Sequence, residues 1–204
     1  MVFSSLADAL ELEPNHLEAL KLMAQLLTER KKYGEAGRII ETLAASGLPE
    51  KELLKMEYPV AVALADRRAA SFIKAPDYSR PIEIKLRLCE LEKGCSLHPY
   101  DLGQIYRKAK DYTSAADAFI SALEIRRAEK EPATPEPKRI ILEIGDCYLK
   151  AEDYEQAVHW FSRLANEYPE DPLGSAMLDL VTVEKLLAEG GKLDVETIRR
   201  ALDK

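Results

Sequence analysis

The chain has 204 residues, of which 47% are apolar and 32% are charged, a balance that excludes a disordered tail and a membrane protein. No apolar run approaches the roughly 18 residues needed to span a bilayer. The net charge is −7 and the 29 basic residues alternate with acidic ones, so a direct nucleic-acid ligand is not expected.

The first two elements are predicted to be helical. Residues 1–14 have the spacing of a single helix that ends near "ELEPN". A helical hairpin is predicted for 17–49, because apolar and small residues recur three and four positions apart on both sides of Tyr33. This hairpin ends near Pro49.

The next segment, 50–95, departs from a simple hairpin. Its first half reads as a long helical stretch interrupted at Pro59, and we expect a short extra helix near 50–57. Its second half contains "IEIKLRLCEL", residues 82–91, whose strict alternation is typical of a strand. A lone strand would have no partner here, so we predict a helix.

The second half of the chain shows two clearer hairpins, at 97–127 and 138–171. The loop between them, 128–137, is rich in proline and charge. Two capping helices are predicted within 173–203. The first, about 173–189, is amphipathic and ends at a glycine pair, and Asp194 begins the second.

A pentapeptide recurs at the predicted turns. "KAPDY" ends at Tyr78, "KAKDY" at Tyr112 and "KAEDY" at Tyr154, and "ERKKY", which ends at Tyr33, is a weaker copy. The interval from Tyr78 to Tyr112 is about 34 residues, a period typical of helical repeat arrays, and the next interval is longer. The last two hairpins also agree elsewhere, because both contain a glycine, a tyrosine, an alanine and a phenylalanine at the same phase: Gly103, Tyr106, Ala115 and Phe119, then Gly145, Tyr148, Ala157 and Phe161.

This pattern resembles the tetratricopeptide repeat, a 34-residue helix–turn–helix unit with a Leu-Gly-x-x-Tyr, Ala-x-x-x-Phe and Pro signature. The resemblance implies an all-α fold, an α-α superhelix in which about four hairpins form a right-handed solenoid with C-terminal capping helices. Residues 1–14 would then be the tail of a preceding repeat, and 50–95 a degenerate repeat with an extra helix. We expect that the chain is cut from a longer array, the alternative being a lone cap helix at its start.

The repeated small residues carry a physical meaning of their own. Glycine inside a helix costs about 1 kcal/mol relative to alanine, so Gly103 and Gly145 at one phase predict a close approach between helices. The bulky aromatic residues of each hairpin would fill the space beside them. Asp111 and Asp153 are predicted to cap the helices that follow them.

No constellation in the sequence points to catalysis, a cofactor or a metal. Cys89, Cys95 and His98 have wider spacing than a zinc site and lack a fourth ligand. Cys147 is expected in the core and His159 at the surface. Three cysteines, an odd number, and the absence of a secretory signal favour a reducing, cytoplasmic or nuclear compartment.

The resemblance implies that a protein or peptide partner binds a concave groove lined by the first helix of each repeat. Carrying the register over gives nine candidate groove residues: Lys21, Gln25, Thr28, Tyr100, Gln104, Arg107, Arg139, Leu142 and Asp146. A carboxylate clamp of the co-chaperone type is a less favoured alternative. Lys21 and Gln25 resemble two of its positions, but Asp101 and Glu143 fall where such a clamp needs Asn or Arg.

The predicted function is a non-enzymatic scaffold or adaptor for protein–protein interaction, as a segment of a larger repeat protein in a multiprotein assembly. The alternative is a regulatory or partner-recruiting arm of a multidomain enzyme whose catalytic residues lie outside this chain. Self-association through the unpaired end helices is a further possibility, and a repeat fold does not distinguish among these.

Overall fold

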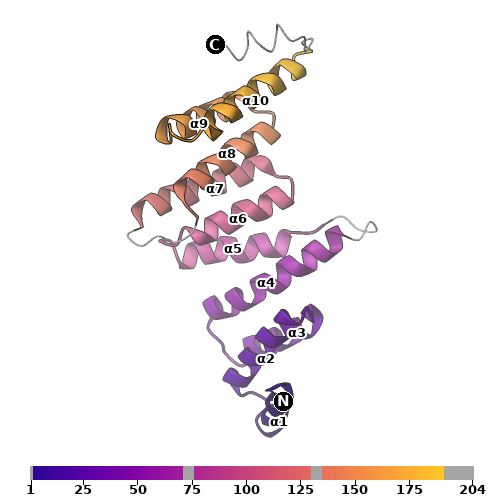
Figure 1. The fold of residues 1–204 in the computed structure, drawn as a ribbon. Helices are drawn as coiled ribbons and strands as arrows, with labels where there is room; N and C mark the ends of the chain where they lie inside the picture. The colour runs from indigo at the N-terminus through magenta and orange to yellow at the C-terminus, as the bar shows by residue number, and fades with distance from the viewer. Residues whose placement is uncertain (1, 71–75, 130–134, 191–204) are drawn as a thin grey trace. The chain divides into compact units, whose positions relative to one another are not determined.

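The computed structural model describes residues 2–70, 76–129 and 135–190, which form ten α-helices and no strand in those ranges (Figure 1). The predicted all-α fold is confirmed. The helices are α1 Val2–Leu12, α2 Leu17–Glu29, α3 Tyr33–Ala45, α4 Glu50–Ala69, α5 Ser79–Leu91, α6 Leu97–Lys108, α7 Tyr112–Ala128, α8 Pro137–Lys150, α9 Tyr154–Glu167 and α10 Leu173–Ala188. Two compact units divide the chain: unit 1, Met1–Lys93, holds α1 to α5, and unit 2, Gly94–Lys204, holds α6 to α10.

Three hairpins share one turn geometry. In the turns after α2, α6 and α8, the second residue past the helix has a positive φ: 59° at Lys31, 62° at Lys110 and 61° at Glu152. After α6, the backbone N–H of Asp111 donates to the Tyr106 carbonyl and that of Lys110 donates to the Arg107 carbonyl. The same pair of bonds follows α2 and α8, so in these three hairpins the recurring pentapeptide forms a helix C-terminal Schellman turn.

The left-handed residue in this turn gives a direct stability prediction. Replacing Lys110 with glycine is expected to raise the free energy of unfolding by about 0.5–1 kcal/mol, because glycine adopts positive φ without a Cβ penalty. Lys110→Ala is the matched control, since it removes the charge and keeps the Cβ. Chemical denaturation would measure both, and a glycine variant no more stable than the alanine variant would contradict the strain at this position.

The predicted caps are confirmed. The Asp111 carboxylate accepts a hydrogen bond from the Ser114 N–H at 3.1 Å, and Asp153 accepts one from the Gln156 N–H at 3.1 Å. These bonds satisfy donors that the first turns of α7 and α9 would otherwise leave open.

The segment 50–95 is where the structure corrects the sequence prediction. No separate helix forms near 50–57, because α4 continues from Glu50 through the exposed Pro59 to Ala69. Nine residues then separate α4 from α5, against three in the other hairpins. Pro76 stands where those turns need positive φ, and the proline ring fixes φ near −65°, so the short turn cannot form here. The extra residues therefore lie at the end of α4 and in this connection.

The helix predicted over the alternating residues 82–91 is confirmed as part of α5, Ser79–Leu91. Tyr78 anchors its start. The side chain of Tyr78 is buried and its hydroxyl donates to the Asp66 carboxylate at 2.9 Å. Burial first, and then this hydrogen bond, raise the pKa of Tyr78 to about 12.

Aromatic rings packed on glycines organise the core of unit 2. A Cβ added at Gly103 would lie 2.6 Å from Phe119 Cε1, and one added at Gly145 would lie 2.4 Å from Phe161 Cε1. Both phenylalanines are fully buried. The predicted close approach of paired helices is thus confirmed, and in each pair the phenyl ring occupies the space above the glycine.

The α4/α5 pair replaces this arrangement with a different one. Lys85 stands one repeat period before Phe119, at the same repeat position, and its side chain is only 4% exposed. Its Nζ lies 3.9 Å from the centroid of the Tyr58 ring, a cation–π contact. In this pair the contact between Lys85 and Tyr58 takes the place of the phenylalanine–glycine contact of the hairpins in unit 2. This is one reason why the sequence of this repeat departs from the pattern.

The last described helix matches the capping helix predicted for 173–189. Gly174 lets α10 approach α9, since a Cβ there would lie 2.5 Å from the Ala165 backbone nitrogen. Val181 is fully buried in the core of unit 2. The final helix predicted after Asp194 falls outside the described residues.

Candidate partner-binding groove

In unit 2, the polar candidates on α6 and α8 are brought together. Gln104 Nε2 of α6 donates to Glu143 Oε1 of α8 at 3.4 Å. Arg107 Nη2 donates to Asp146 Oδ2 at 3.2 Å, and the Arg107 guanidinium also forms an ion pair with Glu143. The first helices of two successive repeats are thus joined through these polar side chains.

Two further cations complete this polar array, which we define as Gln104, Arg107, Arg139, Glu143, Asp146 and Lys150. Arg139 Nε lies 3.8 Å from Glu143 Oε1, and Lys150 Nζ lies 2.7 Å from Asp146 Oδ2. The Arg139 side chain remains 67% exposed, whereas Glu143 is only 14% exposed. Arg139 and Lys150 therefore present cations to solvent, whereas Arg107 lies about as deep as the carboxylate of Asp146. From sequence, Glu143 was noted only because it does not fit a carboxylate clamp, which needs Asn or Arg at that position.

The two other candidates in unit 2 belong to the core. Tyr100 is 8% exposed, and its ring centroid lies 5.3 Å from that of Phe119. Leu142 is half-buried and packs against the same core cluster. Most of the side-chain surface of Tyr100 is thereby used within the protein.

In unit 1, the three candidates lie on the side of α2 that faces α4. Lys21 Nζ pairs with Glu52 at 2.9 Å and with Glu18 at 3.1 Å, and these hydrogen bonds, the one to Glu52 first, raise the pKa of Lys21. Gln25 and Thr28 line a cavity of about 230 Å³, whose other wall is α4 with Lys55, Met56 and Pro59. Thr28 Oγ1 donates to the Ala24 carbonyl of its own helix at 2.8 Å.

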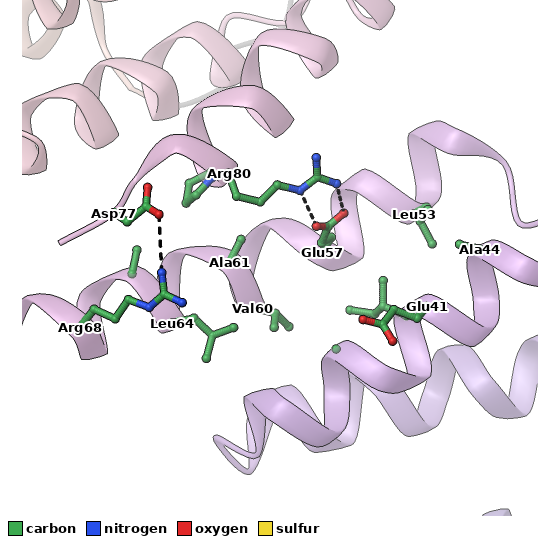
Figure 2. Close-up of a pocket in the computed structure, with 14 residues that line it drawn as sticks. Glu41, Ala44, Leu53, Glu57, Val60, Ala61, Leu64, Arg68, Asp77 and Arg80 are labelled. Atoms are coloured by element: carbon green, nitrogen blue, oxygen red, sulfur yellow. Dashed lines mark hydrogen bonds and ion pairs between the residues drawn. The ribbon is translucent and has the colours of Figure 1, made fainter. Parts of the chain in front are cut away.

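A larger cavity, of about 450 Å³, lies between α3, α4 and α5 in unit 1 (Figure 2). We call it the α3–α5 cavity. Aliphatic residues and glycine form its floor, and five charged residues form its rim: Glu41, Glu57, Arg68, Asp77 and Arg80. Sequence reasoning missed it. Glycines inside helices predicted close contacts between helices, whereas Gly37 of α3 lines this open space.

The described residues offer little for covalent or metal chemistry. No group of three or more His, Cys, Asp or Glu side chains in these ranges is arranged to hold a metal ion. Burial raises the pKa of the Cys147 thiol to about 12, so at neutral pH it is a protonated core residue. His159 is exposed, as predicted. None of the helices described here has the length and apolar character needed to cross a membrane.

The turn, cap and glycine–phenylalanine geometry agrees with a known family. Residues 94–166 match the tetratricopeptide repeat family model, which covers the two hairpins with the best-preserved signature. Residues 94–166 contain tetratricopeptide repeats. The resemblance seen in the sequence is therefore confirmed. A comparison with curated proteins found no significant match.

Solved structures of other tetratricopeptide repeat proteins share the fold. A repeat protein from Parabacteroides merdae is 14% identical, with a TM-score of 0.60 over 98% of this chain and 77% of its own. YrrB, described as a repeat protein with an unusual peptide-binding site, is 18% identical, with a TM-score of 0.59 over 85% and 81%. MamA from Desulfovibrio magneticus is 17% identical, with a TM-score of 0.56 over 92% and 93%. At these identities the likeness concerns the fold, which in general supports protein–protein interaction.

Proposed function

We propose that this chain is a non-enzymatic scaffold or adaptor that binds a protein or peptide partner on the first-helix side of its repeats. The polar array on α6 and α8 carries this proposal. It holds hydrogen-bonding groups from two repeats in one fixed, partly exposed arrangement, and preorganised groups lose less entropy when they bind.

The charge pattern of the array favours an acidic or polar segment over a free carboxylate terminus. Arg139 and Lys150 also pair with carboxylates of the array, but their side chains stay 67% and 43% exposed, whereas Arg107 is engaged by both Glu143 and Asp146 and is only 25% exposed. Lys21 is likewise engaged by Glu18 and Glu52. A carboxylate clamp would have to displace these internal partners, so the co-chaperone alternative is less well supported.

Two other functions fit the same fold. The chain could serve as the regulatory or partner-recruiting arm of a multidomain enzyme, which the full-length gene would show through a catalytic domain beside the repeats. Self-association through the end helices is a third candidate, since Leu180 and Leu187 of α10 are 42% and 46% exposed. A monomer whose light-scattering mass does not change with concentration would argue against it.

The groove proposal is tested by affinity capture with a double variant, Gln104→Ala with Arg139→Glu. These two changes leave the buried Tyr100 and the half-buried Leu142 in place, so the fold should be retained. We expect recovery of bound proteins to fall at least about fivefold, because the variant removes one hydrogen-bonding group and reverses an exposed charge.

The matched control is Lys93→Glu, which makes the same kind of charge change at an exposed residue outside the helices. It should leave recovery unchanged. Equal recovery with the wild type and the double variant would show that the α6–α8 face is not the binding site.

A further inference from the structure

The α3–α5 cavity lies on the opposite side of α4 from the candidate groove. The residues of α4 that face the smaller cavity beside α2 are Lys55, Met56 and Pro59. Those that face the α3–α5 cavity include Glu57, Ala61 and Leu64. At 3.6 residues per turn, these two sets point away from each other. Within unit 1, the larger cavity is therefore a separate surface from the one lined by Gln25 and Thr28.

The cavity runs along about four turns of α4. Its lining residues on α4 recur every three to four positions and form one stripe: Leu53, Glu57, Val60, Ala61, Leu64, Ala65 and Arg68. From Leu53 to Arg68 this stripe extends about 22 Å, at 1.5 Å per residue. Leu64 is 40% exposed at its edge, and a Cβ added at Gly37 on the facing helix α3 would meet no atom within 4 Å.

The polar groups of this surface are confined to its rim. Figure 2 shows Arg80 paired with Glu57 and Arg68 paired with Asp77, at 2.7 Å and 3.5 Å. Both pairs link α4 to the start of α5. The floor is aliphatic. Sites for small ligands usually place a few polar groups inside the pocket, so this surface is better suited to apolar side chains from another polypeptide.

The rim also carries an excess of negative charge. It has three carboxylates, Glu41, Glu57 and Asp77, against two guanidinium groups, which gives a net charge of −1. The two arginines are neutralised by their pairs with Glu57 and Asp77. Glu41 extends from α3 (Figure 2) and forms no ion pair or hydrogen bond with another residue in the described ranges. A lysine or arginine of a bound polypeptide could form an ion pair with Glu41.

We propose that the α3–α5 cavity is a second docking site, which binds an amphipathic helix whose apolar stripe is flanked by basic residues. The apolar side chains, three to four positions apart, enter the space between α3 and α5, and a lysine or arginine beside them meets Glu41.

A synthetic peptide tests this site directly. The probe is an amphipathic helix of about 15 residues, a length at which an alanine-rich peptide begins to be helical in water, made of alanine, lysine and leucine. Its leucines are spaced three and four positions apart. We expect saturable binding to the full chain that shifts the methyl resonances of Ile40, Leu53, Val60 and Leu64. The counterpart peptide with glutamate in place of lysine should bind at least about tenfold more weakly.

Gly37→Phe places a ring at a position that lines the cavity and where an added Cβ meets no atom within 4 Å, so it should abolish this binding. Gly34→Phe is the matched control, because Gly34 lies in the same helix, also has open space at its Cβ and does not line the cavity. Glu41→Gln should weaken binding about two- to fivefold, the range of an exposed ion pair.

Several outcomes would overturn the site. These are equal binding by the Gly37 and Gly34 variants, equal binding of the acidic peptide, no saturable binding at all, or methyl shifts confined to α6 and α8. The groove variant Gln104→Ala with Arg139→Glu should bind the peptide normally, so a failure of either proposal is distinguishable from a failure of the other.

Discussion

Replacing Gly145 with alanine is expected to lower the free energy of unfolding by about 2 kcal/mol, the middle of the range for an overpacked core, despite the better helix propensity of alanine. The added methyl group would lie 2.4 Å from Phe161 Cε1 and 2.7 Å from Cδ1 and Cζ. Carbon atoms at contact are separated by about 3.5–4.0 Å, and Phe161 is fully buried, so its ring has no free space to enter.

Three further variants separate the clash from other effects of the substitution. Gly37→Ala places the same methyl group in open space inside α3, so it should stabilise the protein by up to about 1 kcal/mol. Phe161→Leu removes the ring that blocks Gly145, so the double variant Gly145→Ala with Phe161→Leu should be more stable than the sum of the single effects predicts. Denaturant unfolding measures all four proteins. Strict additivity would mean that the ring contact is not the cause.

Gly174→Ala is expected to detach α10 from the rest of unit 2. Here the new methyl group would meet backbone atoms, the Ala165 nitrogen at 2.5 Å and its Cα at 2.6 Å. A backbone cannot rotate aside as a side chain can, so the strain has to be relieved by displacement of the helix. Because α10 is the last described helix of its unit, it can separate locally while α6 to α9 stay folded.

Hydrogen exchange resolved by segment measures this effect. Amides of α10 should lose about 10- to 100-fold protection in the Gly174 variant, and those of α7 and α8 should change little. The buried Val181 should become accessible to solvent at the same time. Unchanged protection in α10 would show that the close α9–α10 approach does not hold the helix in place.

The two best-preserved hairpins could be predicted from sequence because their contacts are local. Gly103 and Phe119 lie on adjacent helices of one hairpin, so a fixed spacing in the sequence gives a fixed contact in space. The turn between them is equally local, since the Lys110 conformation and the Asp111 cap involve only neighbouring residues. A repeated sequence pattern of this kind therefore predicts the contacts and the turn within each hairpin.

The second hairpin of unit 1 could not be assigned correctly in the same way. This hairpin contains more residues than the others. From sequence, Pro59 therefore looked like the end of a helix, and the residues before it looked like a short additional helix. Packing overrode the cost of the proline, because Leu54 on one side of it and Val60 and Ala61 on the other are buried. The helix propensities of the residues around Pro59 do not include the free energy gained by this burial.

Sequence register also predicted where some side chains of the candidate groove lie, but not where others lie. Register placed Gln104, Arg107, Arg139 and Asp146 on one face. In the structure Glu143 contacts the first three, and Arg107 also contacts Asp146. Register also placed Tyr100 there, yet its ring turns toward Phe119 and is buried. A helical position specifies the direction of the Cβ atom but not where a long side chain ends.

The sequence by itself determined the all-α fold, the repeat period, the turns and the glycine–phenylalanine contacts. Tertiary structure alone decided the burial of Lys85 against Tyr58, the ion pairs between α6 and α8, and the open space between α3, α4 and α5. The physical reason is the range of the interactions. Periodicity states which face of a helix is buried, whereas the distance between faces of helices far apart in the chain depends on how every side chain between them packs.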